Sequence, residues 1–177
     1  QATSMRDVVE IGIQLTRALD YAHKKGIIHR DIKPGNIMLV SSGNQVKVTD
    51  FGICRIDGSD QELTQHTQLG DVLGTPNYMS PEQVLGQKVD SRSGLFSVGV
   101  VLYKLVTGAL PFEGDSIISV AMKSTQTDPP TVEKLRPDVP LSLRRVIERS
   151  LKKQPEKRYQ TGEEFAQALI GVARELK

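Results

Sequence analysis

Apolar residues recur every three or four positions near the start of the chain. The positions are Val8, Ile11, Leu15, Ala18 or Leu19, and Ala22. This spacing lines one face of an amphipathic helix and predicts a helix over about residues 4–24. Ser4 and Asp7 fit a capping box at its start, and Gly26 fits a stop at its end.

Two short apolar runs follow at residues 37–40 and 46–49, on either side of the turn sequence Ser-Ser-Gly-Asn. Runs of this length around a turn predict a small β-hairpin. From Asp50 to about Glu82 the apolar pattern disappears, and Thr, Gln, Gly, Asp and Ser dominate. A long polar stretch of this kind is typical of a loop that regulates the protein or contacts its substrate.

The rest of the chain is predicted to be helical. Residues 93–106 are apolar nearly all round, which indicates a central buried helix. Further helices are predicted over 117–122, 141–151 and 162–176, separated by loops that contain proline. The predicted fold class is therefore mainly α, a helical bundle with one small β-hairpin that carries polar loops.

The composition agrees with one globular domain: the chain has 177 residues, of which 38% are hydrophobic and 25% are charged. A net charge of +2 gives no reason to expect nucleic acid or a membrane surface as a partner. The single cysteine, Cys54, excludes an internal disulfide and fits a reducing compartment. We interpret it as a small core residue rather than a redox switch.

No run in the sequence is long and apolar enough to cross a bilayer, and the N-terminus has no signal-peptide core. The chain starts at Gln1, so we interpret it as a piece of a longer protein. Its expected location is the cytoplasm. A membrane anchor or sensor domain elsewhere in the parent protein is compatible with that location.

Residues 29–36 read His-Arg-Asp-Ile-Lys-Pro-Gly-Asn. Asp31 has the chemistry of a weak general base for a substrate hydroxyl, and Lys33 brings a cation to a phosphate. Asn36 offers a neutral oxygen to a hard ion such as Mg²⁺, and Asp50, which opens an Asp-Phe-Gly triplet, offers a charged one. An Asp or an Asn beside Pro-Gly would alone be interpreted as shaping a turn. The whole set predicts phosphoryl transfer.

These motifs resemble the protein kinase family, and within it the eukaryotic-like serine/threonine kinases of bacteria. Lys33 after Asp31 fits the serine/threonine branch. Residues 74–82, Gly-Thr-Pro-Asn-Tyr-Met-Ser-Pro-Glu, resemble the end of the family's activation segment, and 105–108 and 158–161 are similar to the bacterial members. The resemblance implies an α+β family fold, of which the whole chain forms the larger, C-terminal lobe.

The resemblance also assigns roles to individual residues. Thr75 would hydrogen-bond to the catalytic pair Asp31 and Lys33. ATP, as co-substrate, and Mg²⁺ would be bound by Lys33, Asn36, Met38 and Asp50, with Met38 as the floor of the adenine pocket and Asn36 and Asp50 as metal ligands. Structural roles are implied for His29, Arg30, Phe51, Gly52, Glu82 and Arg158, of which the last two would pair with each other.

The activation segment is expected over about residues 50–82. In the family, the Arg before the catalytic Asp, here Arg30, often receives a phosphothreonine from this segment. Thr64 and Thr67 are the best candidates for phosphorylation because they lie mid-loop in a Thr- and Gln-rich stretch. The alternative is that both are simply solvated polar residues. The parent protein is thus expected to be a phosphoprotein of bacterial signalling, with proteins as substrates.

The sequence before residue 29 contains no phosphate-binding motif of the form Gly-x-Gly-x-x-Gly. In the family this motif, the ATP-anchoring Lys and its Glu partner lie on the N-terminal lobe, so the chain alone is expected to be inactive and to bind ATP weakly or not at all. The face that meets the missing lobe would be partly apolar. Self-association, or a loop that folds back over this face, is therefore expected.

One position departs from the family pattern. Gly94 stands where the bacterial relatives usually have an Asp that accepts hydrogen bonds from the backbone near His29 and Arg30. This favours an alternative reading as a pseudokinase or a scaffold that binds a partner, whereas the complete catalytic set favours an active kinase. An unrelated phosphate-binding protein would require every motif to be a coincidence. His23 and His66 are interpreted as surface residues without ligand partners.

Overall fold

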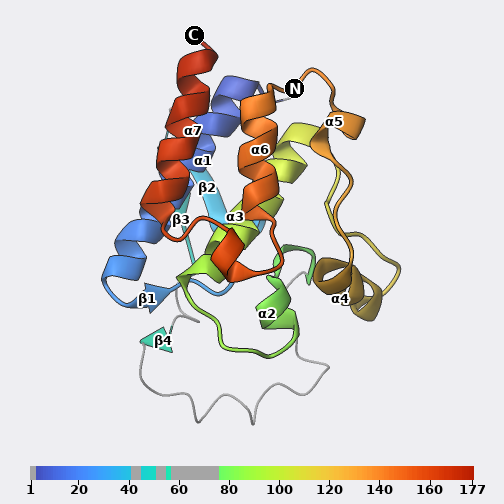
Figure 1. The fold of residues 1–177 in the computed structure, drawn as a ribbon. Helices are drawn as coiled ribbons and strands as arrows, with labels where there is room; N and C mark the ends of the chain where they lie inside the picture. Colours follow the sequence, from blue (N-terminus) through green and yellow to red (C-terminus); the bar gives the residue numbers. More distant parts are fainter. Residues whose placement is uncertain (1–2, 41–44, 51–54, 57–75) are drawn as a thin grey trace.

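The computed structural model describes residues 3–40, 45–50, 55–56 and 76–177 of the chain. Most of this part is helical, which confirms the predicted fold class (Figure 1). The α-helices are α1 (Met5–Lys24), α2 (Pro81–Val84), α3 (Ser91–Thr107), α4 (Ile117–Gln126), α5 (Val132–Leu135), α6 (Leu141–Ser150) and α7 (Gly162–Glu175). Short 3-10 turns are η1 (Pro34–Asn36), η3 (Pro76–Tyr78) and η4 (Pro155–Lys157). No helix of the described residues is long and apolar enough to cross a membrane.

The predicted hairpin is present. Strand β2 (Ile37–Val40) pairs antiparallel with β3 (Gln45–Val48), with Ile37 opposite Val48. A second, unpredicted pair joins β1 (Ile27–Ile28) to β4 (Arg55–Ile56), also antiparallel. Strands of two residues show no alternation, so the sequence pattern could not indicate them.

Helix α1 begins and ends as its caps predict. The Ser4 hydroxyl accepts the backbone N–H of Asp7 at 3.1 Å, which satisfies one of the free donors of the first turn. At the other end, Gly26 has a φ of +75° and donates its N–H to the His23 carbonyl. This left-handed conformation costs glycine little, and it turns the chain into β1.

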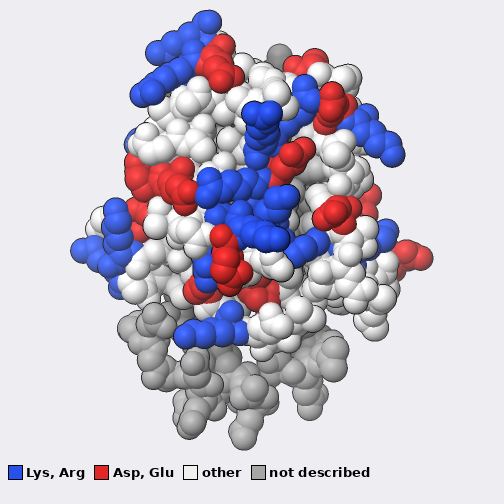
Figure 2. Space-filling view, in the orientation of Figure 1, with Lys and Arg blue, Asp and Glu red and all other residues white. Residues whose placement is uncertain are grey.

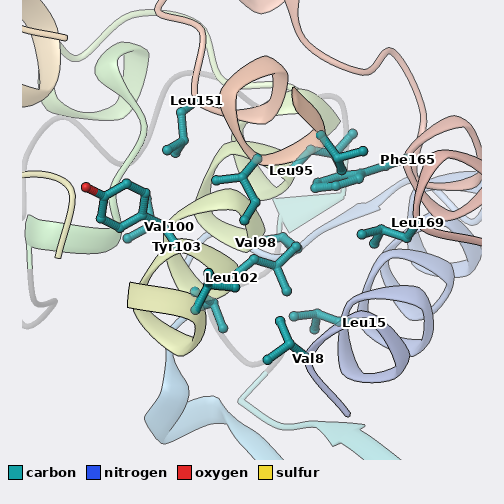
Figure 3. Packing of buried hydrophobic residues seen from close by; sticks show 14 of the residues in the cluster. Val8, Leu15, Leu95, Val98, Val100, Leu102, Tyr103, Leu151, Phe165 and Leu169 are labelled. Atoms are coloured by element: carbon teal, nitrogen blue, oxygen red, sulfur yellow. The ribbon is translucent and has the colours of Figure 1, made fainter. Parts of the chain in front are cut away.

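Helix α3 runs through the middle of the bundle and packs against α1 and α6 (Figure 1). Helix α7 lies antiparallel along α1 and makes the most extensive contact between any two elements. Side chains from these helices meet in one core, seen in Figure 3 for Leu15, Leu95, Val98, Leu102 and Leu169. All five are fully buried, and each contributes about 1.5–3 kcal/mol to folding by leaving water. The central buried helix is thus confirmed.

The surface position predicted for His23 is wrong. Both ring nitrogens are buried and make no hydrogen bond to any residue that the structure describes. His23 follows the fully buried Leu19 by four residues, so it lies on the inward face of α1. Burial, which outweighs the charges of Asp20 and Asp90, lowers the pKa of this imidazole below its ordinary value.

Two glycines of α3 differ in the space around them, and this gives a prediction for stability. A Cβ on Gly94 would meet Leu19 Cδ1 at 3.6 Å and the His29 carbonyl oxygen at 3.7 Å, which are ordinary contacts. Gly94→Ala is therefore expected to raise the free energy of unfolding by about 0.5–1 kcal/mol, because Ala restricts the unfolded chain. A Cβ on Gly99 would overlap the Ser150 side chain, so Gly99→Ala should lower it by about 1–3 kcal/mol. Urea unfolding measures both; a loss of stability at Gly94 would contradict the prediction.

Candidate active site

The 29–36 loop brings three polar side chains together. The Asp31 carboxylate lies 3.4 Å from the Lys33 ammonium and 3.2 Å from the Asn36 amide nitrogen. The same amide nitrogen donates to the Asp31 carbonyl at 2.7 Å. Asn36 is buried in η1, whereas the side chains of Asp31 and Lys33 are about a quarter exposed, at 27% and 24%. The loop therefore presents a carboxylate and an ammonium group to solvent, and the amide of the buried Asn36 holds Asp31 in place through hydrogen bonds.

His29 connects this loop to the end of the hairpin. Its Nδ1 accepts the backbone N–H of Asp31 at 3.1 Å, and its Nε2 lies 2.8 Å from the Thr49 carbonyl. Since Nδ1 is an acceptor, Nε2 must carry the hydrogen that is donated to Thr49. The buried ring thus holds the two loops together, which agrees with the structural role that the family resemblance implies for His29.

Asp50 leaves the hairpin next to Asn36. The Thr49 N–H donates to the Asn36 carbonyl at 2.8 Å, which extends the β2–β3 ladder by one step, and Asp50 is the next residue. Asp50 is exposed and has a φ of +58°, a left-handed conformation that Asp tolerates better than most residues. Backbone strain of this kind is concentrated at functional sites.

Asn36 and Asp50 offer oxygen atoms of the kind that a magnesium ion takes. Because the Asn36 nitrogen faces Asp31, its Oδ1 is the amide atom left for a cation, and no hydrogen bond from the described residues reaches it. An amide oxygen and a carboxylate are hard donors of the type that Mg²⁺ takes. Met38 lies two residues further, on β2, with 55% of its surface exposed. It is thus accessible to a ligand.

Several predicted site residues cannot be compared with the structure. Phe51, Gly52, Thr64, Thr67 and Thr75 lie outside the described residues, as do Cys54 and His66. The sequence predicts a polar loop from Asp50 to about Glu82. The structure corrects this prediction in the two parts of that range that it describes, residues 55–56 and 76–82. These parts contain β4 and, near the end, η3 and the start of α2.

The predicted pair of Glu82 and Arg158 is present and buried. The two guanidinium nitrogens Nη1 and Nη2 donate to the two carboxylate oxygens at 2.7 and 2.8 Å. Ser93 also donates to this carboxylate, and the rest of the guanidinium donates to the carbonyls of Arg92, Lys152 and Lys153. Burial raises the pKa of Glu82, but the hydrogen bonds from Arg158 and Ser93 and the charge of Arg158 outweigh it and hold the pKa below its usual value. The pair fixes α2 against α3 and the 152–158 segment.

Gln83 is a further residue of the site that the sequence reasoning missed. Its Nε2 donates to the Arg30 carbonyl at 2.9 Å, and its Oε1 accepts the Ser80 N–H at 3.0 Å. Ser80 in turn accepts the Gln83 N–H, which completes a capping box for α2. The Ser-x-x-Gln pattern could have indicated the cap. The contact with Arg30, at a separation of 53 residues, could not be inferred from it.

Removal of the Gln83 side chain should weaken the link between α2 and the 29–36 loop. Gln83→Ala leaves the Arg30 carbonyl and the Ser80 N–H without this partner. The free energy of unfolding is expected to fall by about 1–3 kcal/mol. Gln87→Ala, on an exposed side chain of the same segment, serves as the control and should change it by less than about 0.5 kcal/mol. Equal effects of the two substitutions in urea unfolding would contradict this role.

Comparison with known proteins gives one consistent result. The family model described as "Protein kinase domain" matches residues 1–170. The chain is 46% identical over 173 residues to "Serine/threonine-protein kinase pkn3" of Myxococcus xanthus, with 95% of this chain and 32% of that protein covered. It is 44% identical over 169 residues to "Serine/threonine-protein kinase PknA" of Mycobacterium tuberculosis, covering 96% and 37%. It is also 44% identical over 167 residues to "Serine/threonine-protein kinase PknB" of Mycobacterium leprae, with 94% of this chain and 26% of that protein covered. The chain thus spans about a third of the length of these curated relatives.

Proposed function

The chain belongs to the protein kinase family, and from this we propose that its parent protein transfers the γ-phosphoryl group of ATP to Ser and Thr hydroxyls of proteins. The observation that carries the proposal is the contact of Asp31 with both Lys33 and Asn36. Phosphoryl transfer needs a positioned hydroxyl and neutralised charge more than it needs covalent chemistry, and these residues supply both. The printed names of the relatives support Ser and Thr as acceptors.

Each residue of the constellation has a distinct task in this proposal. The Asp31 carboxylate orients the substrate hydroxyl and accepts its proton. The Lys33 ammonium, 3.4 Å from that carboxylate, faces the negative charge of the transferred group. Asn36 holds Asp31 in place through its amide nitrogen and, with Asp50, would hold Mg²⁺ through oxygen atoms. When bound, Mg²⁺ neutralises phosphate charge.

ATP would lie against the hairpin. Met38 is exposed on β2 and offers an apolar surface for the floor of the adenine pocket. The Gly-rich loop and the anchoring Lys of the family's N-terminal lobe do not occur before residue 29 in this sequence. We therefore expect this chain alone to be nearly inactive and the parent protein to be active.

Regulation in this proposal acts through the activation segment, about residues 50–82. Phosphorylation of Thr64 or Thr67 would order the segment by pairing with Arg30. Arg30 supports this role because its Nε makes no hydrogen bond to the part of the chain that the structure describes. Thr75 would complete the site by bonding to Asp31.

The proposed function is tested with γ-labelled ATP, Mg²⁺ and a generic basic protein as acceptor. The full-length parent protein is expected to label the acceptor on Ser and Thr, and this chain alone to label it at background level. Chelation of Mg²⁺ by EDTA should abolish the transfer, and Ca²⁺ should not restore it. Label on Tyr, or no transfer by a folded parent protein, would refute the proposal.

A second candidate function, a pseudokinase that binds a partner, is favoured by Gly94. This residue faces the His29 carbonyl and Leu19, and it has no side chain that could accept hydrogen bonds from the 29–36 loop. If the parent protein is silent in the transfer assay and Gly94→Asp restores transfer, the pseudokinase reading is correct. If the wild-type parent is already active, that reading fails.

A further inference from the structure

A cavity lies between α6, the end of α3 and the segment that joins α4 to α5. Its volume is about 260 Å³. Small-molecule sites usually measure about 300–1,000 Å³, so a ligand for this cavity must be small. Figure 1 shows the joining segment beside α6. No residue of the 29–36 loop lines the cavity, so what it binds does not depend on the proposed function.

The α6 side of the cavity is apolar inside and charged at its edge. Ile147 and Leu151 line it one helical turn apart, linked by the bond from the Leu151 N–H to the Ile147 carbonyl at 3.2 Å, and both are buried. Glu148 and Lys152, the residues that follow each of them, also line it and are exposed. Because residues four apart lie on the same side of a helix, the apolar pair forms a floor and the charged pair a rim.

The opposite wall is held in place from the core. Tyr103 on α3 is 1% exposed, and its hydroxyl donates to the Pro130 carbonyl at 2.7 Å. Pro130 follows Pro129, and two consecutive prolines restrict the backbone of this wall. Val132, also buried, adds an apolar side chain to the floor. The cavity is therefore preformed, as small-molecule sites usually are.

Three charged side chains of the rim have no partner of opposite charge. Asp128, Glu148 and Lys152 form no ion pair and no side-chain hydrogen bond with the residues that the structure describes. By contrast, Arg149 on the same helix pairs with Glu164 at 2.6 Å. Figure 2 shows basic and acidic side chains interspersed on the face over α6. The rim thus offers charges of both signs to a ligand.

Lys153 does not neutralise the acidic part of this rim. The charge of Asp128 acts on the Lys153 ammonium. That ammonium lies 4.0 Å from the centroid of the Phe112 ring and 3.4 Å from the carbonyl oxygen of Lys123, and it forms no ion pair within the described part of the chain. The Asp128 carboxylate is therefore open to an ammonium group from solution.

The combination of these groups selects the ligand. Unpaired charges on an open surface are simply solvated, but around a cavity with an apolar floor they add specificity. Two carboxylates can accept N–H bonds from one ammonium group, and a lysine can donate to a carboxylate. An α-amino acid with an apolar side chain carries all three complementary groups on one carbon atom.

From this arrangement we propose that the cavity binds a free apolar α-amino acid of about the size of leucine. The ammonium group of the ligand pairs with Asp128 and Glu148, and its carboxylate pairs with Lys152. Its side chain enters the cavity and covers the floor.

The first test titrates L-leucine into the full chain with isotope-labelled Ile, Leu and Val methyl groups, followed by NMR. The methyl resonances of Val132, Ile147 and Leu151 are expected to shift and to saturate with a Kd on the order of 0.1–1 mM. Those of Ile118, which is exposed on α4, should stay in place. If the floor methyls show no saturable shift up to about 10 mM, the proposal is overturned.

Two analogues test the charges of the ligand. Isopentylamine keeps the ammonium group and the apolar chain but lacks the carboxylate, and isocaproate lacks the ammonium group. Each is expected to bind about tenfold more weakly than L-leucine, because it loses one charge-assisted pairing. If either binds as tightly as L-leucine, the site does not recognise an amino acid.

Exposed rim variants test the protein side without disturbing the core. Asp128→Asn and Lys152→Gln should each raise the Kd for L-leucine about three- to tenfold. Glu156→Gln and Lys157→Gln, on exposed residues outside the lining, are the matched controls and should change it by less than about twofold. Equal Kd values for the rim and control variants would contradict the assignment of the site.

Discussion

Replacement of Arg158 by Met is expected to lower the free energy of unfolding by about 3–5 kcal/mol. The substitution leaves the Glu82 carboxylate buried without its cation, and it removes donors from the carbonyls of Lys152 and Lys153. Arg158 is 0% exposed, so water cannot replace the lost partner without opening the core. Urea unfolding of the variant measures the effect.

Two controls show whether the unpaired charge causes the loss. The double variant Glu82→Gln/Arg158→Met removes both charges and should recover more than about 1 kcal/mol relative to the single variant. Arg17→Met breaks the half-exposed pair with Glu163 and should cost less than about 1 kcal/mol. If Arg158→Met and Arg17→Met have similar effects, the buried pair is not the anchor that we describe.

The pair of Glu82 and Arg158 also predicts how the free energy of unfolding depends on pH. The pKa of Glu82 is lower in the folded chain than in the unfolded one, so at a given acidic pH the folded chain binds fewer protons at this carboxyl group. Its contribution to stability is therefore fully present above the unfolded pKa of about 4.5 and is lost as the pH falls through the lower, folded pKa. Glu82→Gln should flatten this part of the curve of unfolding free energy against pH. An unchanged slope in the variant would contradict the prediction.

The second large effect concerns activity. Asp31→Asn in the full-length parent protein is expected to reduce phosphoryl transfer by about 10²- to 10⁴-fold, because the amide cannot accept the proton of the hydroxyl. The substitution keeps the size of the side chain. It loses only a partly exposed ion pair with Lys33, so the free energy of unfolding should change by less than about 1 kcal/mol.

Asp115→Asn is the matched control for charge, since Asp115 is exposed and lies on the loop before α4. It should leave the transfer rate within a factor of about two. A folded Asp31→Asn protein with nearly full activity would show that Asp31 is not the base. A loss of activity together with unfolding would instead assign Asp31 to structure.

Much of the fold follows from local pattern. Helix α1 could be predicted together with its ends. Its apolar spacing, the Ser4 cap and the glycine after its last turn, Gly26, all lie within one short segment of the sequence. Helix α4 was predicted only to Met122 but continues to Gln126, since its last turn is polar and has no periodic apolar position to indicate it. Helix α5, a single turn, was too short to show a period.

Some contacts between distant segments could be predicted from sequence motifs, and others could not. The pair of Glu82 and Arg158 was predictable through the family resemblance, because both residues stand in recognisable motifs. The bond from Gln83 to the Arg30 carbonyl was not, since one partner is a backbone atom and leaves no trace in the sequence. The burial of the His23 ring nitrogens was missed because we interpreted histidine as a polar surface residue, although its position four residues after Leu19 places it on the apolar face of the helix.

The imidazole of His29 has a consequence for how the site forms during folding. His29 reaches Thr49 across only 20 residues, whereas Arg158 reaches Glu82 across 76. Short loops close at a smaller entropic cost, so contacts of low sequence separation can form early. We expect the 29–36 loop and the hairpin to assemble as one local unit before the distant pair closes. The bonds of His29 to Asp31 and Thr49 would then be in place in a chain whose helical bundle is still forming.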